Sequence, residues 1–449
     1  MYFDHEVLIN IGMRTKPSFP IRDFDHLLRL LIPSRLLSQI FSAYGPAKRR
    51  PPKLSAFALI KAMLFHFLHG EGTLAQNVRH CTGKAISDSA LSQRRSALGF
   101  EPFYWILQAV LRPRAQAKQH PEAFYKAKRL VALDGTRFSV ANTPQISGVM
   151  FKPVARRFRA AFAKIGACVL VELGLRNPLA ASIGIADESE TALADELIDQ
   201  IPEDSLTLGD RHYGVRPVIE RFFQVGRDFL FRVKSNFKRR LMERYGDGSA
   251  LVELKTDTAK RLVREIIGKV KRPSGKWVEV RLWTSLLDWR KHPAGTLLGL
   301  YARRWEQETF YKELKVDMRS TPLVQSHTPL TAAQEIAALI LAYAILVEER
   351  IKVAAVKQVE VLRISFLKTL EAVRGLWRFL EVTEDMLTVA QVKKVVQRTM
   401  RQIAEMAIPK RRQRSCPRAI RQPVSSWPRL LKNTYQDGAV ACEVLPITA

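Results

Sequence analysis

Two short apolar segments, each ending in an aspartate, constrain the fold of this chain more than any other feature. RLVALDG contains Asp134 and SLTLGD contains Asp210, and each segment is typical of a buried strand. Between them, KIGACVLVELGL and LAASIGIA predict two further strands, and SETALADELIDQI predicts an amphipathic helix. Three strands, a helix and a fourth strand form an α/β unit. Reacting groups collect at the carboxyl ends of strands in such sheets, so we expect both aspartates at one edge.

Each aspartate has a plain structural interpretation as well, because an acid followed by glycine or a polar residue often caps a turn. Taken singly, Asp134 and Asp210 fit that interpretation better. If the two strands are neighbours, the crowded carboxylates repel each other and raise each other's pKa. A divalent cation removes that cost, so the pair would form a metal site.

A third acid lies in the predicted long helix GTLLGLYARRWEQETFYKELK. Four of its polar residues project within an arc of about 60° if the α-helix is unbroken: Tyr301, Arg304, Glu308 and Lys315. A solvated, ion-paired face is the alternative, because Arg304 and Glu308 are four residues apart. The neighbouring aromatic residues make the helix too bulky to face only solvent. A metal-binding acid bordered by phosphate-binding cations is the interpretation that favours DNA chemistry.

The charge balance indicates a polyanionic partner. Lys and Arg number 72 against 43 Asp and Glu, which leaves +29 and a pI near 10.2. A basic protein without a particular partner, such as a ribosome-associated factor, is the alternative. The four cysteines form no CxxC pair, which disfavours a zinc site or a disulfide framework and suits a reducing cytoplasm. The N-terminus has no signal-peptide pattern, and the longest apolar run, 337–347, is too short to span a bilayer. We therefore expect a soluble cytoplasmic protein with no membrane partner.

Residues 23–119 are predicted to be helical. GTLAQNVRHCTGKAISDSALSQRRSALG predicts a short helix, a turn at Thr82-Gly83, and a second helix that begins near Ser87 or Asp88. A helix-turn-helix of this kind suits entry into the DNA major groove, although ordinary helix pairs share the pattern. The residues that the second helix would offer to DNA are Ser92, Gln93, Arg94 and Arg95.

The chain turns to β-structure again from Val215 to about Leu286. DFLFRVK, LVREIIGKVK and KWVEVRLW predict strands, separated by the charged or glycine-containing stretches KRRLMERYGDGSA and RPSG. This segment looks like an insertion into the α/β unit. Further on, residues 393–433 contain twelve Lys or Arg and one acid. Such a tail is either a DNA-binding arm, which we favour, or a solvated end.

ALDGT around Asp134, LTLGDRHYG around Asp210, and YARRWEQETFYKELK together resemble the IS4 family of bacterial insertion-sequence transposases. The hallmark of that family is Tyr, two residues, Arg, three residues, Glu, six residues and Lys, and this chain matches it without a gap. The resemblance extends through SDSALSQRR and through RSTPLVQSHTPLTAAQEIAALILAY, and covers roughly residues 25 to 350.

The resemblance implies an α/β fold: an RNase H-like catalytic core interrupted by a β-rich insertion. A helical N-terminal DNA-binding domain would precede the core, and a helical, basic C-terminal region would follow it. The expected divisions are a helical domain 1–125, core 126–214, β-rich insertion 215–290, core 291–390, and tail 391–449.

The resemblance also implies the chemistry. Asp134, Asp210 and Glu308 would be the DDE residues, which hold two Mg²⁺ ions with Mn²⁺ as a substitute. Such ions activate a water, stabilise the leaving 3′-oxygen, and so permit cleavage at the element ends and transfer of the freed end to target DNA. A nuclease of the same fold that cuts without joining, and a domesticated, non-catalytic DNA-binding derivative, are the alternatives.

Other roles follow from the same likeness. Phosphates near the element end would contact Tyr301, Arg304 and Lys315. The partners would be double-stranded DNA, both as terminal inverted repeats and as target, and a second copy of the chain in a homodimer. Some members use an insertion-domain tryptophan to hold a flipped base. None of the candidates Trp277, Trp283 and Trp289 aligns by spacing, and Trp283 better suits sheet packing. His212 is interpreted as a packing or phosphate-binding neighbour rather than a ligand.

Overall fold

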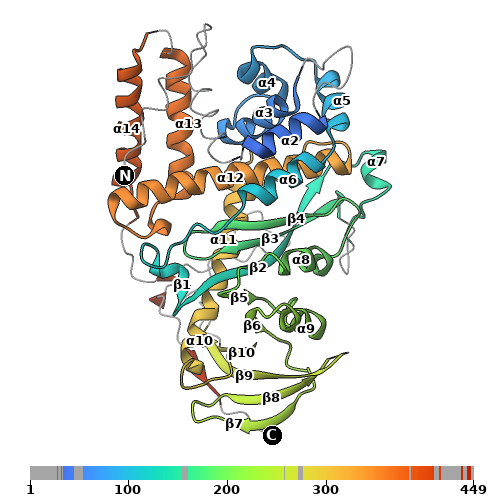
Figure 1. Cartoon of the computed structure of the whole chain (residues 1–449), viewed down its shortest axis with the longest axis vertical. Coiled ribbons are helices and arrows are strands. Elements are labelled where there is room, and N and C mark those ends of the chain that lie inside the picture. Colours follow the sequence, from blue (N-terminus) through green and yellow to red (C-terminus); the bar gives the residue numbers. More distant parts are fainter. Residues whose placement is uncertain are drawn as a thin grey trace.

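The protein has a mixed α/β fold with one large central sheet and helices on both of its faces, as seen in a computed structural model (Figure 1). The structure describes residues 28, 32, 34–44, 54–153, 160–256, 258–271, 277–383, 386–408, 414–415, 436–437 and 442–445.

The strands of the central sheet run in the order β4-β3-β2-β5-β6-β10-β9-β8-β7. β3 is antiparallel to both β2 and β4, whereas β5 is parallel to β2 and β6 is parallel to β5. The strands of this core half are β1 (Phe124–Tyr125), β2 (Lys128–Val140), β3 (Lys164–Glu172), β4 (Asn177–Ile183), β5 (Ser205–Gly209), β6 (Asp228–Arg232) and β11 (Leu323–Val324). The predicted unit of three strands, a helix and a fourth strand is confirmed.

β2 is longer than the sequence predicted, because it does not end at Asp134. It pairs with β5 only from Arg129 to Ala132, and it then continues along β3 as far as Ser139. On the side where β5 has ended, β11 pairs with Ser139 and Val140. The described part of β2 therefore passes a gap in the sheet between the end of β5 and the start of β11, and Asp134 lies at that gap.

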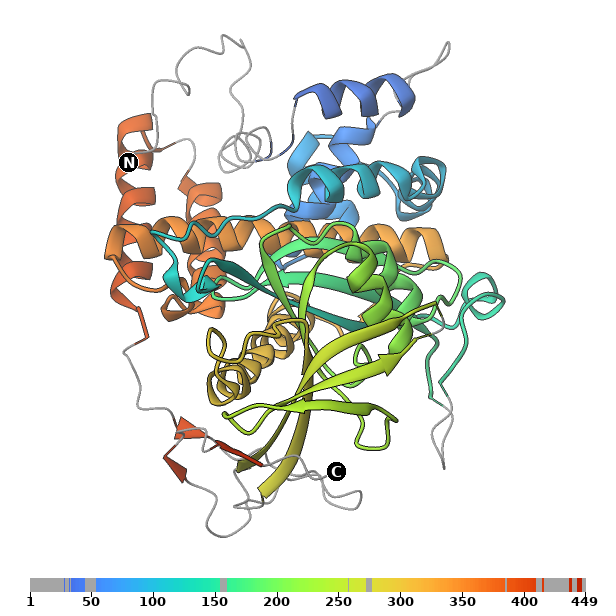
Figure 2. The same ribbon diagram turned by 60° about the horizontal axis from the view of Figure 1, so that its bottom comes forward.

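The predicted insertion is β-rich and continues the core sheet. β10 pairs antiparallel with β6, so hydrogen bonds run unbroken from the core into the insertion (Figure 2). Its strands are β7 (Arg240–Arg244), β8 (Ala250–Lys255), β9 (Lys260–Lys271) and β10 (Trp277–Thr284), with β14 (Cys442–Val444) on β9. The stretch KRRLMERYGDGSA was predicted as a separator and instead contains β7, which pairs with β8 through exposed, charged residues. A strand without apolar alternation leaves little pattern to detect.

Strand residues alternate between two cores. In β3, Ala167 and Val169 face the larger cluster, and Cys168 and Leu170 face the other. The second cluster is completed by α8 (Glu190–Ile198) and α9 (Arg216–Gln224). A third cluster joins the sheet to α10 (Ala294–Tyr301).

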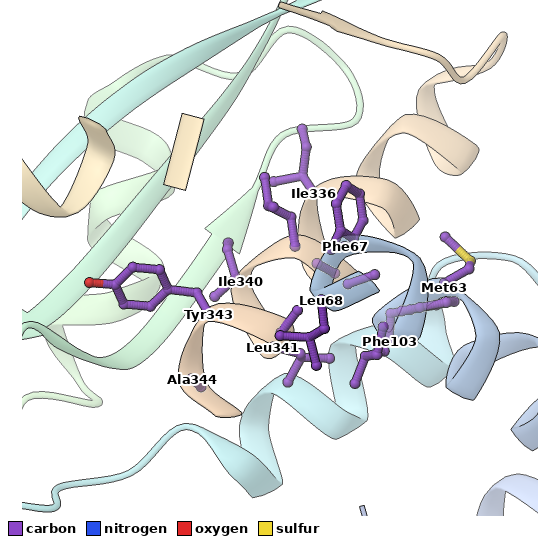
Figure 3. Close-up of a cluster of buried hydrophobic side chains, with 14 of the residues drawn as sticks. Met63, Phe67, Leu68, Phe103, Ile336, Ile340, Leu341, Tyr343 and Ala344 are labelled. Atoms are coloured by element: carbon purple, nitrogen blue, oxygen red, sulfur yellow. The ribbon is translucent and has the colours of Figure 1, made fainter. Parts of the chain in front are cut away.

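The larger cluster is built around α12 (Pro329–Lys357), which begins with a Thr328 capping box. Ile336, Ile340 and Leu341 pack against helix residues such as Phe67 and Phe103, as Figure 3 shows. By length, and by the composition of its most apolar window, α12 could cross a membrane, contrary to the expectation from the shorter run 337–347. However, 89% of its most apolar window is buried inside the protein, which is typical of a core helix.

The N-terminal helices agree with the predicted helix-turn-helix. α4 ends at Thr82, Gly83 closes it with φ 68°, and Ser87 caps the next helix through a hydrogen bond from Ala90. The helices of this region are α2 (Ser34–Tyr44), α3 (Ala56–His69), α4 (Leu74–Thr82), α5 (Asp88–Leu98) and α6 (Glu101–Val110).

The expected DNA-reading face of α5 is only partly available. Ser92 and Gln93 are exposed, as the sequence predicted. Arg95 instead points inward: its guanidinium donates to Gln334 and Ser326 and to the Thr331 carbonyl at the start of α12. Arg94 donates to the Leu54 carbonyl and is half-buried. The Arg95 guanidinium is therefore directed into the protein rather than toward DNA, whereas contact of Ser92, Gln93 and Arg94 with DNA stays a prediction.

Two helices of the C-terminal region pack against α12: α13 (Phe366–Thr383) and α14 (Val389–Glu405). The expected division at 390/391 falls inside α14, so the basic tail does not begin there. The remaining short elements are α7 (Pro144–Ser147), η2 (Pro121–Ala123), η5 (Val361–Arg363) and the pair β12 (Arg414–Ser415) and β13 (Gln436–Asp437). Most of the predicted basic arm lies outside the described residues.

Candidate active site

Asp134 and Asp210 lie level with each other across two neighbouring parallel strands. Ala132 pairs with Leu208 in the β2–β5 register, and each aspartate follows two residues later. The loop after Asp210 is held close to β6: a Cβ on Gly214 would lie 2.1 Å from the Arg232 carbonyl oxygen, so only glycine fits there. The two acids therefore share the edge that the sequence predicted, although β2 runs on past it.

The segment with the third acid is helical but not an unbroken α-helix. α10 ends at Tyr301, a 3₁₀ turn (η3) spans Ala302–Arg304, α11 spans Trp305–Lys312, and a π turn (η4) spans Glu313–Asp317. The 60° arc assumed a constant 100° per residue, and that assumption is wrong. Apolar side chains at Phe310 and Leu314 nevertheless hold the segment against α12.

Arg304 joins two of the three acids. Its Nη2 lies 2.7 Å from Glu308 Oε1, and its Nη1 lies 3.6 Å from Asp134 Oδ2. The Arg304 side chain is 15% exposed and that of Asp134 is 19% exposed, so the contact is largely sheltered from water. Glu308 is therefore brought next to Asp134, and a cationic group occupies the space between their carboxylates.

Asp134 carries the strongest electrostatic perturbation of the three acids. Burial raises its pKa to about 7, and the nearby charges of Asp210 and Glu190 raise it as well, while Arg304 opposes them. A carboxylate that is this hard to ionise beside other acids indicates a site short of positive charge.

Glu190, at the start of α8, is a member of this cluster that the sequence did not reveal. Its Oε1 accepts hydrogen bonds from the Gly135 amide (3.1 Å) and the Tyr213 hydroxyl (2.9 Å). A Cβ on Gly135 would lie 2.4 Å from the Glu190 carboxyl carbon, so this contact requires glycine directly after Asp134. The only sequence signal was a serine N-cap followed by an acid, which occurs at many helix starts.

The helix that carries Glu308 is also fixed to the backbone of the strands. The Tyr311 hydroxyl donates to the Asp134 carbonyl at 2.5 Å, and the Gln307 amide donates to the Val169 carbonyl at 3.0 Å. Gln307 is fully buried and Tyr311 nearly so. These two bonds set the position of Glu308, which directly follows Gln307 and lies three residues before Tyr311, relative to Asp134.

Lys315 lies beside β2, at the residues that follow Asp134 along that strand. Its ammonium donates to the Thr136 hydroxyl and to the Arg137 carbonyl, at 3.0 and 2.8 Å. Burial lowers its pKa, and the neighbouring cations Arg319 and Lys164 lower it further. Lys164, Lys315 and Arg319 thus form a cationic cluster, of which only Lys315 was predicted.

The remaining candidates have clear positions. Burial raises the pKa of Tyr301 to about 12, with Arg304 and Arg232 close by. His212 is exposed and lies within hydrogen-bonding distance of Thr191, and its backbone amide donates to Asp210. Trp283 is fully buried and donates to Glu265, which confirms its packing role.

The two other tryptophans of the insertion differ from Trp283. Trp289 stacks on Tyr245, and Trp277 is exposed.

The described residues contain no group of three or more His, Cys, Asp or Glu side chains arranged to hold a metal ion. The donor set nevertheless fits a cation. Asp134 and Glu308 already share the positive guanidinium of Arg304, and burial beside Asp210 and Glu190 disfavours the ionised form of Asp134. Carboxylate oxygens are the ligands that Mg²⁺ prefers.

Comparison with known proteins agrees with this geometry. Residues 125–345 match the family described as "Transposase DDE domain". This chain is thus a transposase of the DDE class, an enzyme of DNA transposition that cleaves and transfers DNA strands. Within that class its sequence is similar to a transposase of the IS4 element. Enzymes of the class use divalent metal ions and act on DNA.

The individual relatives differ in how much of the chain they match. "Transposase InsG for insertion sequence element IS4" of Escherichia coli (strain K12) is 25% identical over 370 residues, 78% of this chain and 80% of that protein. "Putative transposase InsZ" of the same strain is 24% identical over 161 residues, 35% of this chain and 54% of that protein. A cryo-EM structure of a piggyBac transposase synaptic complex with hairpin DNA covers 88% of this chain and 86% of its own at 10% identity, with a TM-score of 0.41.

Proposed function

We propose that Asp134, Asp210 and Glu308 are the catalytic triad of this transposase and that together they hold two divalent cations, Mg²⁺ or in its place Mn²⁺. The level positions of the two aspartates and the Arg304 bridge from Asp134 to Glu308 support this proposal. The bridge carries the most weight, because it brings an acid from a distant helix to the edge where the strand acids lie.

The fold that carries the triad is an RNase H-like core. Three antiparallel strands, a helix, and two strands parallel to the first support that assignment. Residues 126–214, β6 and residues 291–383 form the core, and β7 to β10 form its β-rich insertion. The helical segment 1–125 and the basic tail after α14 are DNA-binding regions.

Each residue of the proposed site has its own role in the reaction. When bound, divalent cations supply activation of the attacking water and stabilisation of the leaving 3′-oxygen. Asp134 loses its proton as the cations bind, because ionisation is then compensated. Arg304, displaced from the two carboxylates, turns to a DNA phosphate beside Tyr301 and Lys315. Glu190 and Tyr311 hold the Asp134 backbone in place throughout.

The substrates are double-stranded DNA at the terminal inverted repeats of the element and in the target. Two ends must be brought together, so the active form is a homodimer, and the enzyme works in the bacterial cytoplasm. The net charge of +29 suits this polyanionic substrate.

Glu308→Gln tests the triad. The full chain is incubated with Mg²⁺ and a plasmid that carries the element ends, and cleavage and end binding are measured separately. We expect cleavage to fall at least about a thousandfold, because a charged ligand is lost, while binding changes little. Asp317→Asn, which removes an acid paired with Lys312 in the same helical segment, is the matched control. Full cleavage by the Glu308 variant would exclude this acid from the site.

Joining separates the transposase from a nuclease of the same fold. The same reaction with a target plasmid should yield strand-transfer product from the wild-type chain. Cleaved ends without any transfer product would favour the nuclease.

A further inference from the structure

The segment that carries the third acid contains two pairs of residues with the same spacing. Glu308 and Lys315 are seven residues apart, and they contact β2, Glu308 through Arg304 and Lys315 directly. Glu306 and Glu313 are also seven residues apart, and each lies two residues before a member of the first pair. Both of these acids contact another part of the sheet, the turn between β3 and β4. The segment is therefore held at that turn while it presents Glu308 and Lys315 to β2.

Glu313 is a buried acid with partners on two separate elements. Its Oε1 accepts a hydrogen bond from the Arg176 guanidinium in the β3–β4 turn, at 2.6 Å. Its Oε2 accepts one from the Tyr343 hydroxyl of α12, also at 2.6 Å. The Glu313 side chain is only 7% exposed. Loss of either partner would leave a buried charge poorly compensated, so this arrangement permits little movement of Glu313.

The two partners of Glu313 are themselves fixed in place. Tyr343 is fully buried, and its ring meets Phe310 edge-on and stacks on Phe366, with ring centroids 4.7 Å apart in both pairs. Arg176 lies in the tight turn between β3 and β4 and has a left-handed backbone, with φ 55°. Glu313 therefore joins its helical segment to rigid points of α12 and of the sheet.

Glu313 is also the first residue of the π turn that contains Lys315. Its carbonyl accepts a hydrogen bond from the amide of Met318, five residues further on, at 3.1 Å. A turn that closes over five residues holds more residues than an α-helical turn, so the side chains within it point in different directions. Lys315 is the third residue of this turn. The direction of its ammonium toward Thr136 and Arg137 of β2 therefore depends on the π turn.

We propose that Glu313 is a positioning residue of the transposase: its bonds to Arg176 and Tyr343 fix the π turn and thereby hold the Lys315 ammonium beside the acids. This inference rests on the proposed function, in which Lys315 contacts a phosphate of the bound DNA. Because Glu313 is buried, it acts through Lys315 and not by contact with the DNA.

A double-mutant cycle tests this dependence. The full chain is prepared as wild type, as Lys315→Ala, as Glu313→Gln, and with both changes. Single-turnover cleavage of a plasmid that carries the element ends is measured with Mg²⁺ at saturating enzyme, and end binding is measured separately with EDTA. Glu349→Gln is the matched control, because Glu349 is an acid of α12 that is 6% exposed and paired with Lys352.

We expect Lys315→Ala to lower the cleavage rate constant about a hundredfold, because a cationic contact to the reacting DNA is lost. Glu313→Gln should lower it at least about tenfold with little change in end binding, because a small displacement of Lys315 weakens that contact. The double variant should cleave within about threefold of Lys315→Ala, since Glu313 acts through Lys315. The control variant should cleave like wild type.

Tyr343→Phe provides a second variant if Glu313→Gln does not fold. It removes one hydroxyl from Glu313 and keeps the packing of the ring. We expect a smaller loss of cleavage than in Glu313→Gln, and no further loss when Tyr343→Phe is combined with Lys315→Ala.

Losses that multiply in the double variant would overturn the inference, because a general loss of folded protein acts independently of Lys315. Wild-type cleavage by both Glu313→Gln and Tyr343→Phe, or an equal loss in Glu349→Gln, would overturn it as well. Wild-type cleavage by Lys315→Ala would remove the role that the proposed function gives to Lys315, and this inference with it. The proposed triad fails independently, because it is tested by Glu308→Gln.

Discussion

Replacement of Asp134 by Asn should stabilise the metal-free protein, and the gain should depend on pH. In the folded protein, burial and the charges of Asp210 and Glu190 raise the pKa of Asp134 from its usual 3.8 to about 7. Above both values the acid is ionised whether the chain is folded or not, and the fold then bears the cost of the buried charge. The neutral amide has no such cost.

The magnitude follows from the two pKa values. A difference of one pKa unit corresponds to about 1.4 kcal/mol, so the separation between 3.8 and about 7 corresponds to about 4 kcal/mol at most. The pKa of about 7 already includes the attraction of Arg304, so we expect a net gain of up to about 4 kcal/mol near pH 8. The sign is fixed: the stability of the wild type falls as pH rises from about 4 to 7. The advantage of the variant therefore grows over that window and is constant above it.

Urea unfolding of wild type and Asp134→Asn in EDTA, near pH 5 and near pH 8, measures this difference. Asp204→Asn, at an exposed aspartate before β5, is the control and should show no pH-dependent gain. Mg²⁺ should stabilise the wild type and leave the Asp134 variant unchanged. An Asp134 variant that is no more stable than wild type near pH 8, or a gain that is the same at both pH values, would refute the electrostatic reasoning.

Three further changes have definite outcomes. Gly135→Ala puts a Cβ 2.4 Å from the Glu190 carboxyl carbon, so we expect the free energy of unfolding in urea to fall by about 1 to 3 kcal/mol and cleavage to be lost. A variant with unchanged stability and cleavage would contradict the contact. Tyr311→Phe removes the hydrogen bond to the Asp134 carbonyl, which should lower the cleavage rate constant more than DNA affinity and reduce stability by about 1 kcal/mol. Hydrogen bonds from Arg261 lower the pKa of Glu220 to about 2, so Glu220→Gln should cost about 2 kcal/mol at neutral pH. That deficit should shrink as pH falls from about 4.5 toward 2, and a deficit independent of pH would argue against the ion pair.

The sequence predicted the strand acids and their common edge because short apolar runs and a parallel arrangement leave few possible positions for the ends of these strands. It could not show that β2 continues past Asp134, since Asp134 and Gly135 are poor strand residues and pairing with β3 keeps them extended. The prediction that Arg95 faces DNA failed because the groups that Arg95 contacts are distant in the sequence. A polar pattern shows which residues are charged, but the acceptors at Ser326 and Thr331 lie more than 200 residues away.

Glu308 was predicted from a helical arc and from the family signature, and the uninterrupted α-helix that the arc assumed proved wrong. The 3₁₀ and π turns on either side of α11 change the angle between Tyr301 and Lys315, and no periodicity reveals such turns in advance. The sequence did not indicate Glu190, because its role depends on the space beside Gly135. That space results from packing between elements that are distant in sequence.

The pairing of β10 with β6 bears on how this protein tolerates truncation. An insertion joined to the core only by linkers could be removed without consequence for the core. Here, removal of β7 to β10 would remove the partner of β6 and leave unpaired amides and carbonyls along a buried, aromatic strand. Exposed edges of that kind recruit strands from other molecules and aggregate. The insertion therefore also protects the solubility of the core, and shortened derivatives of this chain should precipitate before their catalysis can be tested.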